Sequence, residues 1–103
     1  MSRRRIEILT FVGCPHREGA RELVASVLER TGVAGDVELI DVPDPGAAEQ
    51  LRFLGSPTIR VDGRDIEPGA EARRDYALAC RVYSTRLGFR GQPDESWLIE
   101  ALA

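Results

Sequence analysis

The residues of this chain best suited to chemistry are its two cysteines, Cys14 and Cys80, and its single histidine, His16. A cysteine thiolate is a nucleophile and a soft metal ligand, and positive charge nearby stabilises it. Cys14 is followed by Pro15, His16 and Arg17, so basic side chains come soon after it. Two cysteines and one histidine are too few for a four-ligand zinc site, and we predict neither a metal site nor a cofactor.

Each cysteine also has a purely structural interpretation, because an unreactive cysteine packs as a small hydrophobic side chain. Cys14 stands between a strand-like run and a helix-like run, directly before Pro15, and this placement favours a reactive thiol. Cys80 has apolar residues nearby on both sides, so the sequence leaves open whether it packs in the core or takes part in chemistry. For His16, an exposed position that adds charge beside the thiol is a simpler interpretation than a metal ligand.

The hydrophobic pattern predicts the elements that must position these residues. The run 5–12 is rich in β-branched and aromatic residues, which is typical of a buried strand. Over 15–31 the apolar residues recur at three- and four-residue spacing, which predicts an amphipathic helix that ends at Gly32. A second strand is predicted over 37–42. Cys14 therefore falls at the junction of the first strand and the first helix.

The second half of the chain begins with a short helix, which Pro45 starts and Gly55 ends. The runs 56–61 and 64–67 are strand-like, and the Asp-Gly pair between them is a strong hairpin signal. The alanine-rich stretch 70–78 predicts another helix.

The rest of the chain is less regular. Residues 80–83 either continue the alanine-rich helix or form an extended segment. A loop marked by Gly88, Gly91 and Pro93 then leads to a final helix over 95–102, which Asp94 caps.

This order of elements predicts one α/β domain over residues 1–103. A right-handed crossover through the first helix makes the first two strands parallel, and the hairpin adds an antiparallel pair. The fold class is therefore a four-stranded mixed sheet flanked by helices on both faces, with a variable segment between the hairpin and the last helix.

Two short segments resemble the thioredoxin superfamily. The first is FVGCPHR at 11–17, where the superfamily carries a C-x-x-C motif, and the second is GSPTI at 55–59, where it carries a cis-proline that faces the cysteine. The resemblance covers the chain to about residue 67 and the last helix. It implies a thioredoxin-like fold of the small thioredoxin or glutaredoxin type, with 68–93 as an insertion.

The same resemblance assigns roles to individual residues. It implies that Cys14 is the nucleophile and that Pro57 is cis, shaping the groove beside the sulfur. The residues that it places around the substrate are Pro15, His16, Arg17, Ser56, Pro57 and Thr58.

The chain departs from the superfamily at Arg17, which stands where the second motif cysteine would be. That thiol normally resolves the mixed disulfide that forms on the first one. Three alternatives stay open. Cys14 acts as a monothiol that a small thiol such as glutathione resolves; or Cys80 resolves it, if the inserted segment lies over the Cys14 loop; or redox activity is lost and the chain binds a partner. The first two imply that the partner is a thiol or disulfide of a protein or a small molecule.

A narrower resemblance is to small bacterial proteins of this fold that are labelled alkylmercury lyase-like. The shared segments are GCPH at 13–16, GSPT at 55–58 and CRVY at 80–83. This resemblance implies that Cys14 and Cys80 hold mercury or another soft ion, since two thiolates suit soft metals. Lyase chemistry also needs a proton donor, for which Asp62 and Asp75 are the candidates.

Composition limits the classes of function. The chain is 43% hydrophobic and 30% charged, which is ordinary for a soluble domain. A net charge of −3 with scattered arginines argues against nucleic-acid binding. No apolar run approaches the roughly 20 residues of a membrane span, and the start of the chain, with Glu7 inside a short apolar run, does not fit a signal peptide. We expect a cytoplasmic protein with no nucleic-acid or membrane partner.

Overall fold

The computed structural model describes residues 3–103 and is built on a four-stranded mixed sheet of order β2-β1-β3-β4. Strand β1 (Arg4–Thr10) runs parallel to β2 (Gly35–Asp41) and antiparallel to β3 (Thr58–Val61). Strand β3 forms a hairpin with β4 (Arg64–Asp65). The predicted parallel pair, hairpin and four-stranded mixed sheet are confirmed.

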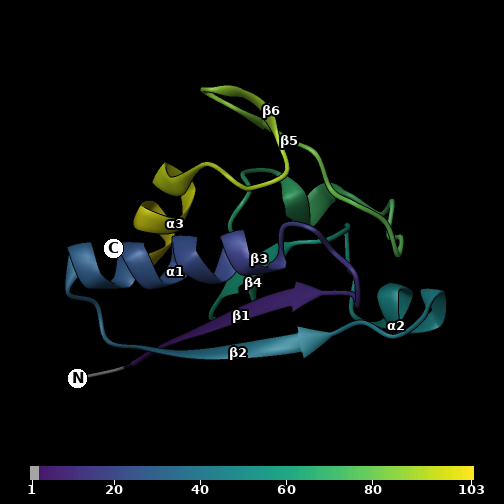
Figure 1. Cartoon of the computed structure of the whole chain (residues 1–103), viewed down its shortest axis with the longest axis horizontal. Coiled ribbons are helices and arrows are strands. Elements are labelled where there is room, and N and C mark those ends of the chain that lie inside the picture. The colour runs from purple at the N-terminus through teal and green to yellow at the C-terminus, as the bar shows by residue number, and fades with distance from the viewer. Residues whose placement is uncertain (1–2) are drawn as a thin grey trace.

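Helices cover one face of the sheet, whereas the order of elements predicts helices on both, and the other face is covered by a helix only at the end of the strands (Figure 1). Helices α1 (Arg17–Thr31) and α3 (Glu95–Leu102) lie on one face, and α2 (Pro45–Gln50) lies at the end of the strands (Figure 1). Because successive side chains of a strand point to opposite faces, Ile8 and Leu9 of β1 enter different cores. Ile8 packs in the core under α1 and α3, whereas Leu9 packs with residues of α2 on the other face.

The polar signals at the ends of elements act as expected. The side chain of Asp44 accepts a hydrogen bond from the backbone of Ala47 at the start of α2, and Asp94 accepts one from Ser96 at the start of α3. The two residues of the predicted hairpin turn, Asp62 and Gly63, have φ of 51° and 84°. Positive φ at both central residues is the geometry of a tight hairpin turn.

Residues 68–93 contain only short elements: the 3-10 turn η1 (Ala70–Ala72), then β5 (Tyr83–Thr85) and β6 (Gly88–Arg90), which form a second hairpin. The predicted helix over 70–78 is wrong. The backbone N–H of Ala77 instead donates to the carbonyl of Phe53, and the carbonyl of Ala79 accepts from the N–H of Ser56. These two bonds to a distant segment override the helix propensity of alanine. The extended alternative for 80–83 is the one that the structure adopts.

Several predicted boundaries are also wrong. Strand β1 ends at Thr10 rather than at residue 12, and α2 ends at Gln50 instead of continuing to Gly55. Helix α1 begins at Arg17 rather than at Pro15, because residues 12–16 form turns before the helix starts. The thiol of Cys14 is therefore in the turn that leads into α1 and not within the helix.

Candidate thiol site

Cys14 lies in the turn between β1 and α1. Its backbone N–H donates to the carbonyl of Phe11 at 3.2 Å, and its own carbonyl accepts from the N–H of Arg17 at 3.4 Å. The residue is 8% exposed, so the thiol is buried at the edge of the molecule. The first N–H groups of a helix have no partner within the helix, and they and the helix dipole favour negative charge close to this end. Cys14 thus lies three residues before the first residue of α1, beside this end of the helix.

Pro57 lies at the same end of the sheet. The Ser56–Pro57 peptide bond is cis, as the resemblance implies. Thr58, the first residue of β3, pairs with Leu9 near the end of β1, so the residues just before β3 lie beside the end of β1. The loop that carries Cys14 starts at that end of β1. The fold thus brings the cis-proline loop and the Cys14 loop to one edge of the sheet.

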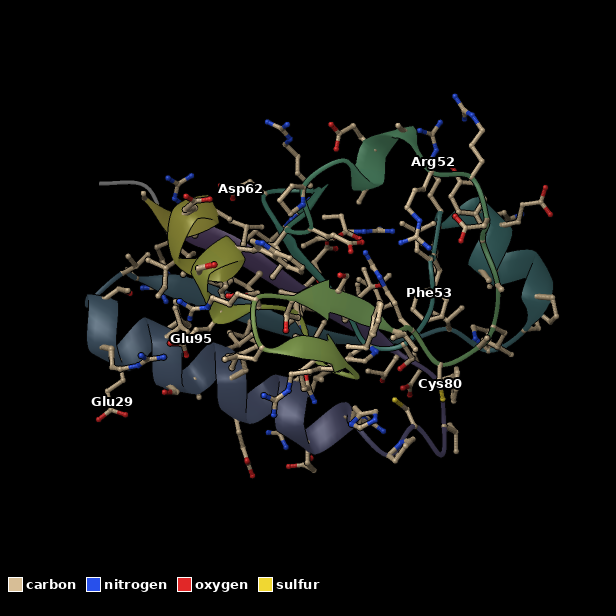
Figure 2. All side chains as sticks on the ribbon, turned by 90° about the horizontal axis from the view of Figure 1, so that it is seen from above. Glu29, Arg52, Phe53, Asp62, Cys80 and Glu95 are labelled. Atoms are coloured by element: carbon tan, nitrogen blue, oxygen red, sulfur yellow. The ribbon has the colours of Figure 1, made fainter. Side chains whose placement is uncertain are left out.

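The segment 68–93 brings Cys80 to this edge as well. Cys80 forms a parallel β-bridge with Ser56: the N–H of Ser56 donates to Ala79 O at 2.8 Å, and the N–H of Arg81 donates to Ser56 O at 2.9 Å. Figure 2 shows Cys80 beside the loop that leads into α1. Cys14 and Cys80 are both free thiols, and Cys80 is exposed. We call residues 79–83 the strap.

A buried arginine anchors the strap. The side chain of Arg81 is almost fully enclosed and donates to Thr58 Oγ1 at 2.9 Å, Asp65 Oδ2 at 2.8 Å and Glu67 Oε1 at 2.7 Å. Burial disfavours its charge, but Tyr83 and these carboxylates outweigh burial and hold the pKa of Arg81 above its ordinary value. The guanidinium is therefore a permanent cation that links the strap to β3 and β4.

Tyr83 anchors the C-terminal end of the strap. The residue is fully buried, and its hydroxyl donates to the carbonyl oxygen of Pro57. Its ring stacks under the guanidinium of Arg81 at 4.4 Å and faces Trp97 of α3 at 6.1 Å between ring centroids. Burial raises the pKa of Tyr83 well above its ordinary value, so the hydroxyl stays a donor. The side chains of Arg81 and Tyr83 thus hold the strap against Thr58 and Pro57, directly after the cis peptide bond.

His16 and Arg17 have partners that the sequence does not reveal. His16 is half-buried, and its ring packs so closely on Gly91 that a Cβ there would lie 2.4 Å from Nε2. Its carbonyl accepts a hydrogen bond from Gln92 Nε2 at 2.8 Å. The expectation of an exposed histidine in the helix is wrong, because residues 91–92 return over it. Arg17 forms an ion pair with Asp41 at 3.7 Å.

The remaining predicted site residues fall into two groups. Ser56 and Thr58 are fully buried, and the hydroxyl of Thr58 donates to Gly55 O at 2.7 Å. Pro15 is exposed in the turn before α1. Asp62 is tied to the N-terminal strand through Arg4 and Arg5, and Asp75 is paired with Arg73, so neither proton-donor candidate is part of the thiol site.

The residues that sequence reasoning missed are Arg81, Asp65 and Glu67, and it treated Tyr83 only as a packing residue. A signal was present in the alternation of CRVY, because a strand places every second side chain on the same face. That period of two puts Arg81 and Tyr83 inward and leaves Cys80 and Val82 exposed, which is the observed arrangement.

The comparisons with known proteins do not assign a family. No protein-family profile matches the chain, and no curated protein and no solved structure matches it significantly. Among residues 3–103, no group of three or more histidine, cysteine, aspartate or glutamate residues is placed to hold a metal ion. In the same range, every helix is too short or too polar to cross a membrane.

Proposed function

We propose that this protein is a thiol–disulfide redox protein with a thioredoxin-like fold, in which Cys14 is the nucleophile and Cys80 resolves the mixed disulfide. The observation that carries the proposal is the β-bridge between Cys80 and Ser56, the residue before the cis-proline. This bridge sets a second thiol at the edge of the sheet where the Cys14 loop begins. Of the three alternatives that Arg17 leaves open, it favours resolution by Cys80.

The reaction takes place in two exchange steps. The Cys14 thiolate attacks one sulfur of a substrate disulfide, a Cys14–substrate disulfide forms, and the other substrate sulfur leaves as a thiolate that takes a proton from solvent. The Cys80 thiolate then attacks Cys14 Sγ, and the first substrate sulfur leaves in the same way. The substrate gains two electrons from the protein's thiols and two protons from solvent. A dithiol or a small thiol then reduces the Cys14–Cys80 disulfide.

The positions of the two thiols favour this order of events. Cys14 is close to the start of α1, where unpaired N–H groups stabilise a thiolate, whereas Cys80 lies on an extended strap without such a helix end.

Single-cysteine variants test the proposal with a disulfide-reductase assay. We expect Cys14→Ser to lose turnover, and Cys80→Ser to accumulate a mixed disulfide between Cys14 and the substrate that mass spectrometry detects. Ser84→Ala, at an exposed position near the strap, is the control and should keep the activity of the wild type. Equal activity of the wild type and Cys14→Ser would contradict the proposal.

The same pair of thiols supports a second candidate, the binding of a soft metal ion as cargo. Two thiolates at one edge of the sheet suit a linear two-coordinate ion such as Hg(II) or Cu(I). Titration with Hg(II) should then give one ion per chain in the wild type and weaker binding in either cysteine variant. Unchanged binding after substitution of both cysteines would exclude this candidate.

A further inference from the structure

The strap occupies the backbone groups that an extended substrate would use. A peptide adds to the edge of a sheet through hydrogen bonds to the N–H and C=O of exposed residues. At Ser56, beside the cis-proline, both groups are already paired, the N–H with Ala79 and the C=O with Arg81. The chain thus supplies its own strand at this position.

The packing beneath the strap leaves no space for a second strand. A Cβ on Gly55 would lie 2.9 Å from Arg81 Cβ and 3.0 Å from Ala79 O, so the two backbones are in direct contact. The ion pairs of Arg81 with Asp65 and Glu67 and the hydrogen bond of Tyr83 to Pro57 hold this contact from below. An incoming peptide would have to break these bonds before it could pair with Ser56.

The surface around the two cysteines is exposed, although Cys14 itself is only 8% exposed at its edge. Cys80 is exposed, and two valines beside the cysteines, Val12 and Val82, are 83% and 65% exposed. Neither segment that carries a cysteine, 11–17 or 78–84, contains an aspartate or glutamate. A small disulfide needs no strand pairing to reach the thiols, and a negatively charged one meets no carboxylate within these two segments.

We infer that the strap restricts this site to low-molecular-weight disulfides, including anionic ones, and excludes extended polypeptides. This inference rests on the proposed redox function of Cys14 and adds its substrate class. Specificity is determined at the backbone of Ser56, whose N–H and C=O are both hydrogen-bonded to the strap.

The test compares two mixed disulfides with the same leaving group. In one, thionitrobenzoate is attached to free cysteine; in the other, it is attached to a cysteine in the middle of an extended peptide. Attack by Cys14 on the cysteine sulfur releases coloured thionitrobenzoate in both cases. The Cys80→Ser protein is used, so that Cys14 is the only thiol and the strap backbone is unchanged.

We expect the small probe to react about tenfold faster than the peptide probe, or more, because the peptide can react well only when the strap opens. Tyr83→Phe removes one anchor and should raise the rate with the peptide by about tenfold, while it changes the rate with the small probe little. Tyr76→Phe is the matched control, because it removes a tyrosine hydroxyl outside the strap. The ratio of the rate with the small probe to the rate with the peptide probe is compared in the Cys80→Ser protein and in the same protein with Tyr83→Phe or Tyr76→Phe. If this ratio is the same in all three proteins, the inference is overturned.

Hydrogen exchange provides a measurement that needs no strap variant. The amide of Arg81 donates to Ser56 and should stay protected when the unmodified protein is mixed with a reduced peptide. Loss of its protection would show that the peptide displaces the strap, whereas the amide of Ser56 would be paired with either strand. If Cys14 reacts with both probes no faster than free cysteine does, the proposed redox function fails. The ratio of the two rates still tests the strap in that case, because any thiol exchanges with these probes at alkaline pH.

Discussion

Ser56 and Cys80 are joined by a parallel β-bridge, which places an exposed thiol beside the residue that precedes the cis-proline. The bridge is made by the segment 68–93, which has little regular structure of its own. Its position depends on two buried side chains that follow Cys80, those of Arg81 and Tyr83, and this dependence leads to the predictions that follow.

Oxidation should join Cys14 and Cys80 within one chain. A disulfide needs Cα atoms within about 7 Å, and the strap brings Cys80 to the edge where the Cys14 loop begins. Treatment with diamide followed by peptide mapping without reductant should identify this bond in the monomer. Products that contain only disulfides between chains would show that the two thiols are not partners.

Substitution of Arg81 should destabilise the protein strongly. Arg81→Met leaves Asp65 and Glu67 without their buried cation, and we expect the free energy of unfolding to fall by about 3–5 kcal/mol. Urea denaturation measures the change. Arg90→Met, at an exposed position on β6, should change the free energy by no more than about 0.5 kcal/mol. Similar effects of the two variants would mean that the buried cluster does not hold the strap.

Gly55→Ala should destabilise the protein in two ways, through the backbone conformation of residue 55 and through contact with the strap. Comparison with a glycine that has positive φ but no neighbour separates the two costs. Gly55 has φ of 121°, and an added Cβ would press on Arg81 and Ala79. Gly88, with φ of 102°, has no atom within 4 Å of the same added group, so Gly88→Ala reports the backbone cost, about 1–2 kcal/mol. We expect Gly55→Ala to lose about 1–3 kcal/mol more in the free energy of unfolding. Equal losses would show that the strap yields freely.

Stability should fall in acid, partly through Asp94. Burial alone would raise the pKa of Asp94, but hydrogen bonds from Ser96 and the backbone of Arg86, together with the charge of Arg86, hold it below its ordinary value. A carboxyl whose folded-state pKa is lowered stabilises the protein above its unfolded-state pKa of about 3.9, and this stability is lost as the pH falls through the folded-state pKa.

Asp94→Asn keeps a capping acceptor and removes the charge. We therefore expect the variant to be about 1 kcal/mol less stable than the wild type at neutral pH, with the difference disappearing in strong acid. Urea denaturation at several pH values measures it, and Glu29→Gln on α1 is the control. A difference that is constant with pH would contradict the assignment.

The sequence by itself determined the framework of this protein. The periods of its apolar residues, the capping Asp94 and the Asp-Gly turn are local signals, and each acts on residues a few positions away. They were sufficient to predict the sheet, the last helix and the junction at which Cys14 lies. The cis bond at Pro57 was predicted from the resemblance of a short segment.

Only the tertiary structure decided how residues 68–93 are arranged. The alanines at 70–79 favour a helix locally, but backbone bonds to Phe53 and Ser56 and the burial of Arg81 favour an extended chain more strongly. Those partners lie far away in the sequence, so no local pattern contains them. The position of Cys80 beside the cis-proline is therefore a consequence of long-range pairing, and the proposed chemistry of Cys14 depends on it.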